Sequence, residues 1–313
     1  MKILFAPMEG IAHWLYRSAQ HACFDGADEY FLPFWSPRGQ SLTHREQADA
    51  LPENNAGMKA VPQILSNSSE DFLWAAERLK ALGYAEVNIN LGCPSGTVVR
   101  KHRGAGLLAY PEELERFLDG VFEKTPVAVS LKTRLGMESP EEWPALLELF
   151  NRYPARRLIL HPRCRAEQYG GTPHREWFDY TLRESKIPVC YNGDLFTAEA
   201  LHDFERRYPE AESVMCGRGF LYHPGLVNLY HGKPESLAAL RNFHQTLYDG
   251  YRAQIGTEAF VLCKMKEVWA SLGKGMGLPP KALKAVHKAM RYPAYESAVA
   301  GAFAEAAGNE TQP

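Results

Sequence analysis

The stretch Asn88-Ile-Asn-Leu-Gly-Cys-Pro-Ser95 contains an apolar strand that ends at Gly92, directly before a single thiol. Pro94 then holds Cys93 at the point where the strand turns into a loop. A cysteine needed only for packing would more naturally lie inside the strand, where small thiols are commonly buried. Strand ends are the usual location of chemistry in parallel α/β proteins. The stretch therefore predicts a parallel α/β fold in which Cys93 is a candidate reactive group.

Apolar runs rich in β-branched or aromatic residues recur along the chain, as buried parallel strands do. They predict eight strands, at residues 3–8, 30–34, 60–65, 86–91, 127–133, 157–162, 188–193 and 213–218. Helical patterns separate most of them and begin at Ser69, Pro111 and Pro140, whereas the polar segment 36–55 predicts a long loop. Eight such units in about 230 residues favour an α/β fold of the (β/α)8 TIM-barrel type. A Rossmann domain is disfavoured, since no Gly-x-Gly-x-x-Gly follows the first strand.

The pattern changes near residue 224, and apolar residues recur at helical spacing from residue 237 onward. We therefore predict a barrel domain over residues 1–236 and a C-terminal helical bundle domain over 237–313. Residues 241–291 contain nine Lys or Arg against three acids, whereas the whole chain has a net charge of −2. A solvated helical face explains this excess most simply, and a basic stripe that binds nucleic acid is the alternative.

The composition, with 45% hydrophobic and 23% charged residues, is typical of a soluble globular protein. The six cysteines are scattered without a Cys-x-x-Cys pair, which argues against disulfides and zinc and favours a reducing compartment. The N-terminal apolar run ends at Glu9, too soon for a signal peptide, and no run has membrane-spanning length. We expect a cytoplasmic protein that is monomeric and binds neither a membrane nor a metal.

Polar or functional side chains stand at the ends of seven of the eight predicted strands. They are Pro7-Met8, Gln63, Asn90 with Cys93, Lys132 with Arg134, His161 with Arg163, Asn192-Gly193-Asp194 and Gly217-Arg218. Each alone has a plain structural explanation, such as anchoring a loop or reaching solvent. In a barrel, however, the carboxyl ends of all strands converge on one mouth. The recurrence therefore predicts an active site there.

The last two of these clusters predict a phosphate site. Asn192-Gly193-Asp194 and Gly217-Arg218-Gly219 are short glycine-containing turns whose backbone N–H groups can face an anion. Arg218 adds a fixed positive fork, and the loops after strands seven and eight often bind phosphate in this barrel. Lys132 and His161 across the mouth would suit an electron-rich ring system that becomes anionic when reduced.

Six motifs occur in order along the chain. They are Ala6-Pro-Met-Glu-Gly10, Asn90-x-Gly-Cys-Pro-Ser95, Lys132-x-Arg-x-Gly136, His161-x-Arg163 followed by Gln168-Tyr169-x-Gly171, Asn192-Gly-Asp194, and Gly217-Arg-Gly219. Together they resemble the FMN-dependent tRNA-dihydrouridine synthases, over residues 3 to about 225. The helical tail is similar to the RNA-binding bundle of that family in type only.

The resemblance implies that FMN lies over the barrel mouth, with its ring near Pro7 and Met8. It also implies ring-edge contacts from Gln63, Lys132 and His161, and phosphate contacts from Asn192, Gly193, Asp194, Gly217 and Arg218. NADPH would reduce the flavin, and a uridine flipped out of tRNA would receive a hydride at C6 and a proton from Cys93 at C5. A proton donor must stay a thiol, and a thiol of ordinary pKa, about 8.5, is mostly protonated at neutral pH.

Several polar residues would contact the substrate under the same resemblance, namely Asn90, Arg134, Arg163, Arg100 and Arg103. The last two belong to the segment Arg100-Lys-His-Arg-Gly-Ala-Gly106, a few residues after the thiol. A solvated charged loop is its simplest interpretation. Its position and its glycines favour a mobile flap that grips RNA phosphate.

Two other functions remain open from the sequence. An FMN-dependent TIM-barrel oxidoreductase acting on a small pyrimidine such as dihydroorotate would share the flavin site, but has no use for a basic helical tail. A non-redox barrel that acts on a phosphorylated metabolite, or an RNA-binding protein without catalysis, is the third possibility. A yellow purified protein would exclude the non-redox barrel.

Overall fold

The computed structural model describes residues 1–310, which divide into two compact units. The first unit contains Met1–Glu9, Asp28–Asp194 and Tyr208–Cys216, and the second contains Gly10–Ala27, Leu195–Arg207 and the residues from Gly217 onward. Both units are assembled from separate chain segments. The predicted division into domains 1–236 and 237–313 therefore stays a prediction about which part folds independently.

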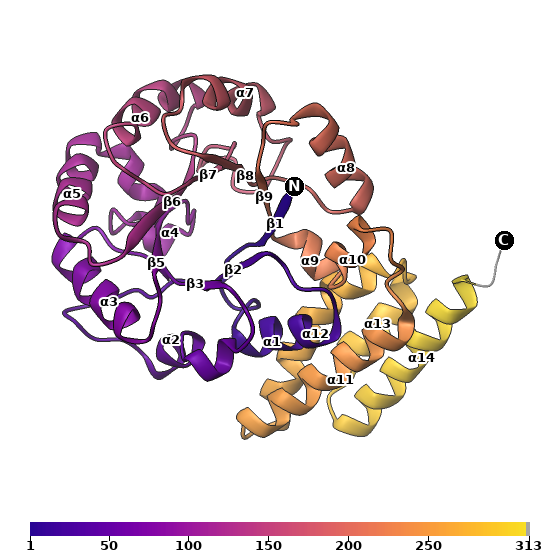
Figure 1. Ribbon diagram of the computed structural model, residues 1–313. Helices are drawn as coiled ribbons and strands as arrows, with labels where there is room; N and C mark the ends of the chain where they lie inside the picture. Colours follow the sequence, from indigo (N-terminus) through magenta and orange to yellow (C-terminus); the bar gives the residue numbers. More distant parts are fainter. Residues whose placement is uncertain (311–313) are drawn as a thin grey trace. The chain divides into compact units, whose positions relative to one another are not determined.

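All the described strands are parallel and belong to the first unit (Figure 1). They are β1 (Lys2–Phe5), β2 (Glu29–Phe31), β3 (Ala60–Val61), β4 (Gln63–Ile64), β5 (Glu86–Leu91), β6 (Ala128–Arg134), β7 (Leu158–His161), β8 (Val189–Tyr191) and β9 (Ser213–Cys216). Neighbours follow the order β3-β2-β1-β9-β8-β7-β6-β5-β4. The two ends of this order, β3 and β4, are covalently joined through Pro62.

Pro62 divides one predicted strand into two halves because proline has no N–H to donate to a sheet. One half pairs with β2 and the other with β5, so the order of neighbours returns to its starting point. A bridge between Trp35 and Ile64 adds a further link across the junction. The eight predicted strands are thus confirmed as a TIM barrel, with the third strand interrupted.

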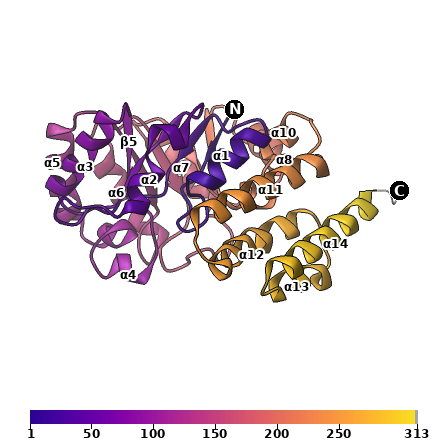
Figure 2. The same ribbon diagram turned by 90° about the horizontal axis from the view of Figure 1, so that it is seen from below.

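The helices of the first unit surround the ring of strands, except α4, which lies over one end of it (Figures 1 and 2). They are α2 (His44–Asp49), α3 (Ser69–Ala81), α4 (Gly96–Val99), α5 (Pro111–Lys124), α6 (Trp143–Phe150) and α7 (Arg175–Glu184), with the 3-10 turns η1 (Pro52–Asn55), η2 (Gly104–Ala109) and η3 (Pro140–Glu142). The predicted starts at Ser69 and Pro111 are confirmed. At Pro140 the chain first forms the 3-10 turn η3, and α6 follows.

The prediction of a long loop at residues 36–55 is wrong in part, because α2 and η1 lie inside it. A capping box starts α2: the Thr43 side chain accepts from the backbone of Glu46, and the Glu46 side chain accepts from the backbone of Thr43. The spacing Thr43-x-x-Glu46 is a known signal for a helix start. The segment lacks a strong apolar periodicity, so its amino-acid pattern alone predicts a loop.

The second unit is helical and consists of α1 (Trp14–Cys23), α8 (Ala198–Arg207), α9 (Arg218–Tyr222), α10 (Leu226–Tyr230), α11 (Leu237–Gln254), α12 (Glu258–Gly275), α13 (Pro280–Lys288) and α14 (Tyr292–Glu310). The last three helices lie side by side (Figure 2). Aromatic side chains fill the space between them and α11: Trp269 and His244 both bond the Tyr295 hydroxyl. Within the described residues, no helix combines the length and apolar character that crossing a bilayer requires.

The barrel interior is apolar at its centre and contains one buried ion cluster. Leu4, Ala6, Phe31, Val61, Ile159, Cys190 and Met215 form the central layer. At the first residue of β2, the Glu29 carboxylate accepts from Lys59 Nζ at 2.6 Å and from Arg157 Nη1 at 2.7 Å. Burial alone would raise the pKa of Glu29, but these hydrogen bonds and charges outweigh it, and the pKa is lowered.

We expect Glu29→Gln to lower the free energy of unfolding by about 3 kcal/mol at pH 7, because the largely buried Arg157 guanidinium then faces a neutral amide. Since the folded pKa of Glu29 is lowered, its contribution is present above the ordinary glutamate pKa of about 4.3. That contribution is lost only as the pH falls through the folded value, so variant and wild type should differ at pH 7 and converge at a pH well below the ordinary glutamate pKa. Urea unfolding at both pH values measures the difference.

Glu115→Gln is the control, since it breaks the exposed Arg152–Glu115 pair and should cost less than about 1 kcal/mol. Equal stability of Glu29→Gln and wild type at pH 7 would contradict the prediction.

Candidate active site

The carboxyl ends of β4 to β7 bring the predicted polar residues next to one another. In the strand register Gln63 lies beside Asn88, Asn90 beside Lys132, and Arg134 beside His161. These neighbours come from segments up to about a hundred residues apart in the chain. The parallel register therefore assembles one polar cluster at the rim of the barrel.

A chain of amide hydrogen bonds crosses three strands below this rim. Asn90 Nδ2 donates to Gln63 Oε1 at 2.7 Å, and Gln63 Nε2 donates to Asn88 Oδ1 at 2.8 Å. Asn88 Nδ2 continues the chain to Ser130 Oγ at 2.9 Å. Asn90 Oδ1 accepts from the backbone N–H groups of Gly92 and Cys93 at 3.1 and 2.9 Å. Asn90 thus fixes the turn that carries the thiol.

The Cys93 thiol is half-buried, and its surroundings keep it protonated. Burial raises its pKa most, and the Glu9 carboxylate raises it further. A backbone hydrogen bond from Ser95 and the charges of Arg134 and Lys132 lower it, but by less in sum. A raised thiol pKa suits a group that donates a proton and disfavours a thiolate nucleophile.

Glycines of the following segment pack directly against this turn. Gly104 has φ +55°, and a Cβ there would lie 2.9 Å from the carbonyl oxygen of Cys93. A Cβ on Gly106 would lie 2.6 Å from the oxygen of Val99. Ala105 N also donates to the Cys93 oxygen at 3.1 Å. These buried glycines allow close packing, and a mobile flap at this segment stays a prediction.

Arg100 and Arg103 occupy that same segment and point to different partners. Arg100 is exposed, and its Nε donates to the Gly96 oxygen at 3.2 Å, within α4. Arg103 donates through Nε to Asn67 Oδ1 at 3.1 Å and through Nη1 to Ser36 Oγ at 3.4 Å. Figure 2 shows α4 projecting beyond α3 and α5 at one end of the first unit. RNA contact by either arginine stays a prediction.

Lys132 is the one cation of the cluster whose side chain makes no hydrogen bond or ion pair to the described residues. Burial, and then the nearby Arg134 guanidinium, lowers the pKa of its ammonium to about 7. A buried amine that lacks a counter-ion gains strongly from an anionic or polar ligand. Lys132 therefore has the chemistry of a ligand-binding residue.

Arg163 has all five of its guanidinium N–H groups engaged and is fully buried. Two bonds form a fork on Asp194, at 3.0 Å to Oδ1 and 2.6 Å to Oδ2. Two more reach the carbonyl oxygens of Gly170 and Gly171 at 2.9 and 2.8 Å. The fifth reaches His161 Nε2 at 3.1 Å. The sequence predicts that Arg163 contacts the substrate, whereas in the structure all five of its N–H groups donate to acceptors within the protein.

The Arg163 bond also decides the tautomer of His161. A guanidinium only donates, so Nε2 of His161 must be the acceptor and carry no proton. The ring is then neutral with its proton on Nδ1. That N–H is a hydrogen-bond donor at the end of β7, as a residue at the edge of a cofactor ring requires.

Arg134 is also buried, and its guanidinium donates to backbone carbonyls of neighbouring loops. Its Nε donates to the Gly92 oxygen at 2.9 Å, and its Nη1 donates to the oxygens of Cys164 and Gln168 at 3.1 and 2.7 Å. Together with Arg163 it fixes the backbone on both sides of Tyr169. The Tyr169 side chain is 57% exposed, with its ring centroid 5.3 Å from Arg134 Cζ and 6.1 Å from the His161 ring. Tyr169 is missing from the predicted site residues, although its motif Gln168-Tyr169-x-Gly171 stands in the sequence.

The predicted phosphate residues divide between the two units. In the first, Asn192 Nδ2 donates to the Met215 oxygen at 2.7 Å, and a Cβ on Gly193 would meet Tyr191 Oη at 2.8 Å. The Asp194 carboxylate is taken by Arg163, so only its backbone N–H remains suited to an anion. In the second unit, Gly217 precedes α9, and Arg218 Cζ lies 4.9 Å from the Phe196 ring centroid.

Pro7 and Met8 follow β1 directly and are half-buried. Across the described residues no group of three or more His, Cys, Asp or Glu side chains could hold a metal ion. The expected absence of a metal stays a prediction.

The model of the dihydrouridine synthase family matches residues 4–287 of this chain. The chain belongs to the dihydrouridine synthase family. A probable tRNA-dihydrouridine synthase 1 from Synechocystis is 36% identical over 231 residues, covering 72% of this chain and 63% of that protein. The tRNA-dihydrouridine(16) synthase from Ralstonia nicotianae is 29% identical over 242 residues, covering 74% and 73%.

Solved structures support the fold of this family member. A morphinone reductase variant in complex with tetrahydroNAD has a TM-score of 0.55 at 13% identity, covering 77% of this chain and 90% of that one. The old yellow enzyme homologue from Zymomonas mobilis has a TM-score of 0.53 at 15% identity, covering 77% and 92%. At these identities the likeness concerns the barrel alone.

We expect the thiol of Cys93 to react with iodoacetamide along a pH profile shifted above the ordinary cysteine value of about 8.5, because only the thiolate reacts. Glu9→Gln should move the midpoint lower, since the Glu9 carboxylate raises this pKa. Mass spectrometry of the Cys93 peptide across pH measures the profile. A midpoint below about 8 in the wild type would contradict the predicted environment.

Proposed function

We propose that this protein reduces the C5=C6 bond of a uridine in tRNA, with FMN as its cofactor and NADPH as the source of electrons. The observation that carries the proposal is a protonated thiol beside an unpaired lysine, at the rim of a barrel of the dihydrouridine synthase family. The named relatives act on tRNA, which supports the substrate class.

The residues of the first unit fit FMN. Lys132 lacks a counter-ion among the described residues, His161 stands at the end of β7, and Gln63 keeps a second Nε2–H beyond its bond to Asn88. These donors suit a ring whose edge carries oxygen and nitrogen acceptors. The turn Asn192-Gly193-Asp194 would hold the phosphate through the backbone of Gly193 and Asp194, since the Asn192 N–H already donates to the Leu160 oxygen at 2.9 Å. We include phosphate contacts from Gly217 and Arg218 in this proposal. Ring contacts from Pro7 and Met8 belong to it as well.

FMN reduced by NADPH would supply the hydride that C6 of the uracil receives. The second hydrogen, a proton at C5, would come from Cys93 Sγ, which then takes a proton from solvent. Asn90 holds the backbone of that cysteine, so its role is to position the donor. Arg134 and Arg163 position the loop that carries Tyr169, an exposed ring suited to contact a base.

A stacked uridine cannot reach the bottom of a barrel mouth, so the base must leave the RNA stack. Phosphate contacts would then come from basic side chains. Arg100 is exposed beside α4, and the helices of the second unit carry nine Lys or Arg against three acids at residues 241–291. Such contacts are salt-dependent and independent of base sequence.

The family assignment disfavours the alternative of an oxidoreductase for a small pyrimidine such as dihydroorotate. The direct test is dihydrouridine mapping in tRNA from a strain that lacks this gene, with and without a plasmid copy. An unchanged dihydrouridine pattern, together with no reduction of that tRNA by the purified protein, would reject the function. Cytoplasmic location and the monomeric state stay predictions.

We expect Cys93→Ala to retain FMN and to lower turnover by about 10²- to 10⁴-fold, the usual contribution of a positioned acid. The visible flavin spectrum reports the cofactor, and dihydrouridine formation reports turnover. Cys263→Ala is the matched control, because that thiol is exposed on α12. Wild-type turnover in Cys93→Ala would exclude the proton-donor role.

We expect the FMN affinity of the flavin-free protein to fall as the pH rises above 7, by at most about tenfold per unit, because Lys132 loses its charge there. Lys132→Met should bind FMN weakly at all pH values between 7 and 9. Quenching of flavin fluorescence measures both. Lys124→Met, at an exposed site on α5, is the control and should keep the wild-type profile.

A further inference from the structure

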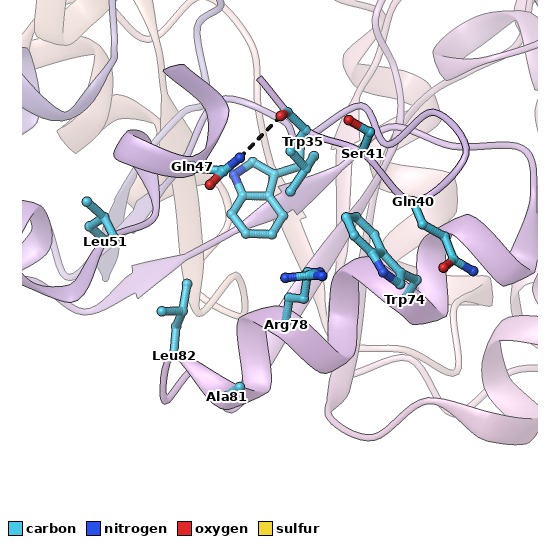
Figure 3. A pocket seen from close by; sticks show the side chains of 10 residues that line it. Trp35, Gln40, Ser41, Gln47, Leu51, Trp74, Arg78, Ala81 and Leu82 are labelled. Carbon is cyan, nitrogen blue, oxygen red and sulfur yellow. Dashed lines mark hydrogen bonds between the residues drawn. The ribbon is translucent and has the colours of Figure 1, made fainter. Parts of the chain in front are cut away.

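A pocket of about 430 Å³ lies between the segment that follows β2 and helix α3, within the first unit (Figure 3). Trp35 contributes from one wall, and Trp74 and Arg78 contribute from α3. Gln40 and Ser41 add exposed polar groups. None of these residues belongs to the catalytic cluster described above.

The two indole rings are held in place by their surroundings. Trp35 is 3% exposed, and its ring N–H donates to the backbone oxygen of Glu46, so its polar edge is satisfied. Trp74 is half-buried, with Arg78 Cζ 4.4 Å from its ring centroid. A guanidinium stacked on an indole, beside a second indole, is a combination that binds planar, electron-rich rings.

Exposed charges of both signs surround the pocket, since Glu53, Glu70 and Glu77 are exposed as well as several arginines. Glu46 uses its carboxylate to accept from Ser36 N and from Thr43 N and Oγ, and Asp49 is 4% exposed. Arg38 and Arg45 are exposed on the same segment. The guanidinium of Arg78 makes no hydrogen bond or ion pair to the part of the chain that the structure describes. Arg78, the one charged side chain among the described residues that line the pocket, suits a ligand that carries phosphate.

Both walls of the pocket are tied to the segment that follows the catalytic thiol. Arg103 donates to Ser36 Oγ, which begins the Trp35 wall, and to Asn67 Oδ1, two residues before α3. Asn67 Nδ2 donates in turn to the oxygen of Lys101 at 3.2 Å. Hydrogen bonds thus connect the residues next to both walls with the segment that the proposed function assigns to RNA.

We propose that this pocket binds an unpaired base of the RNA substrate, at a nucleotide other than the uridine that is reduced. The inference rests on the proposed function. Base stacking on the half-buried Trp74, over a floor that the buried Trp35 provides, with Arg78 facing the adjoining phosphate, would anchor the RNA on this side of the barrel. This contact forms equally in ground state and transition state, so it contributes to KM and leaves kcat unchanged.

The test measures KM and kcat for unmodified tRNA with the FMN-loaded protein. Trp74→Ala and Arg78→Ala should each raise KM about tenfold, within the range that one stacked base contributes, with kcat unchanged. Trp74→Phe keeps an aromatic face and should restore most of the affinity. Trp177→Ala on α7 and Arg116→Ala on α5 are matched controls on other outer helices and should leave KM unchanged.

A second readout does not depend on turnover. With 5-fluorotryptophan incorporated, the fluorine signals of Trp35 and Trp74 should shift when tRNA is added, and the signal of Trp177 should not. An active wild type with unchanged KM in both alanine variants and no shift would overturn the pocket proposal alone. Shifts caused equally by uridine 5′-monophosphate at unchanged KM would overturn it in favour of a free-nucleotide site. A wild type inactive on tRNA would reject the proposed function, and the fluorine signals would still decide the pocket.

Discussion

The buried guanidinium of Arg163 connects three chain segments that would otherwise be independent. It joins the end of β7, the loop around Tyr169 and the turn after β8 through five hydrogen bonds. The Asp194 carboxylate balances its charge, which a buried cation requires. Because a planar guanidinium fixes the angles between its donors, the same group also sets the tautomer of His161. The geometry of the rim depends on this one side chain.

Burial at this rim acts on two groups in the same sense, since it disfavours charge in both. The pKa of the Cys93 thiol is raised, and the pKa of the Lys132 ammonium is lowered to about 7. The thiol therefore keeps its proton, which a donor needs. The Lys132 ammonium has no acceptor or counter-ion among the described residues, and a bound polar ring would provide an acceptor. The same desolvation thus keeps Cys93 protonated as a donor and leaves Lys132 suited to bind a ligand.

The same rim is supported from outside the barrel. Arg103 links the segment after Cys93 to both Ser36 and Asn67, and so to α2 and α3. Gly104 lets that segment approach the Cys93 turn, and Gly106 lets it approach Val99 of α4, more closely than any side chain would permit. A thiol held in this way has little freedom to leave its position, which suits the transfer of a proton to a defined carbon atom.

The sequence by itself determined the local features of the protein. Apolar runs predicted the eight strands, the Ser69 and Pro111 signals predicted two helices, and the Gly-Cys-Pro turn located the thiol at a strand end. These features depend on residues close together in the chain, so their pattern is visible there. Only the tertiary structure decided what Arg134 and Arg163 bind, and that Gly104 serves packing. An arginine bonds whichever acceptors come within reach, and here those acceptors are carbonyls of other loops, which folding alone brings together.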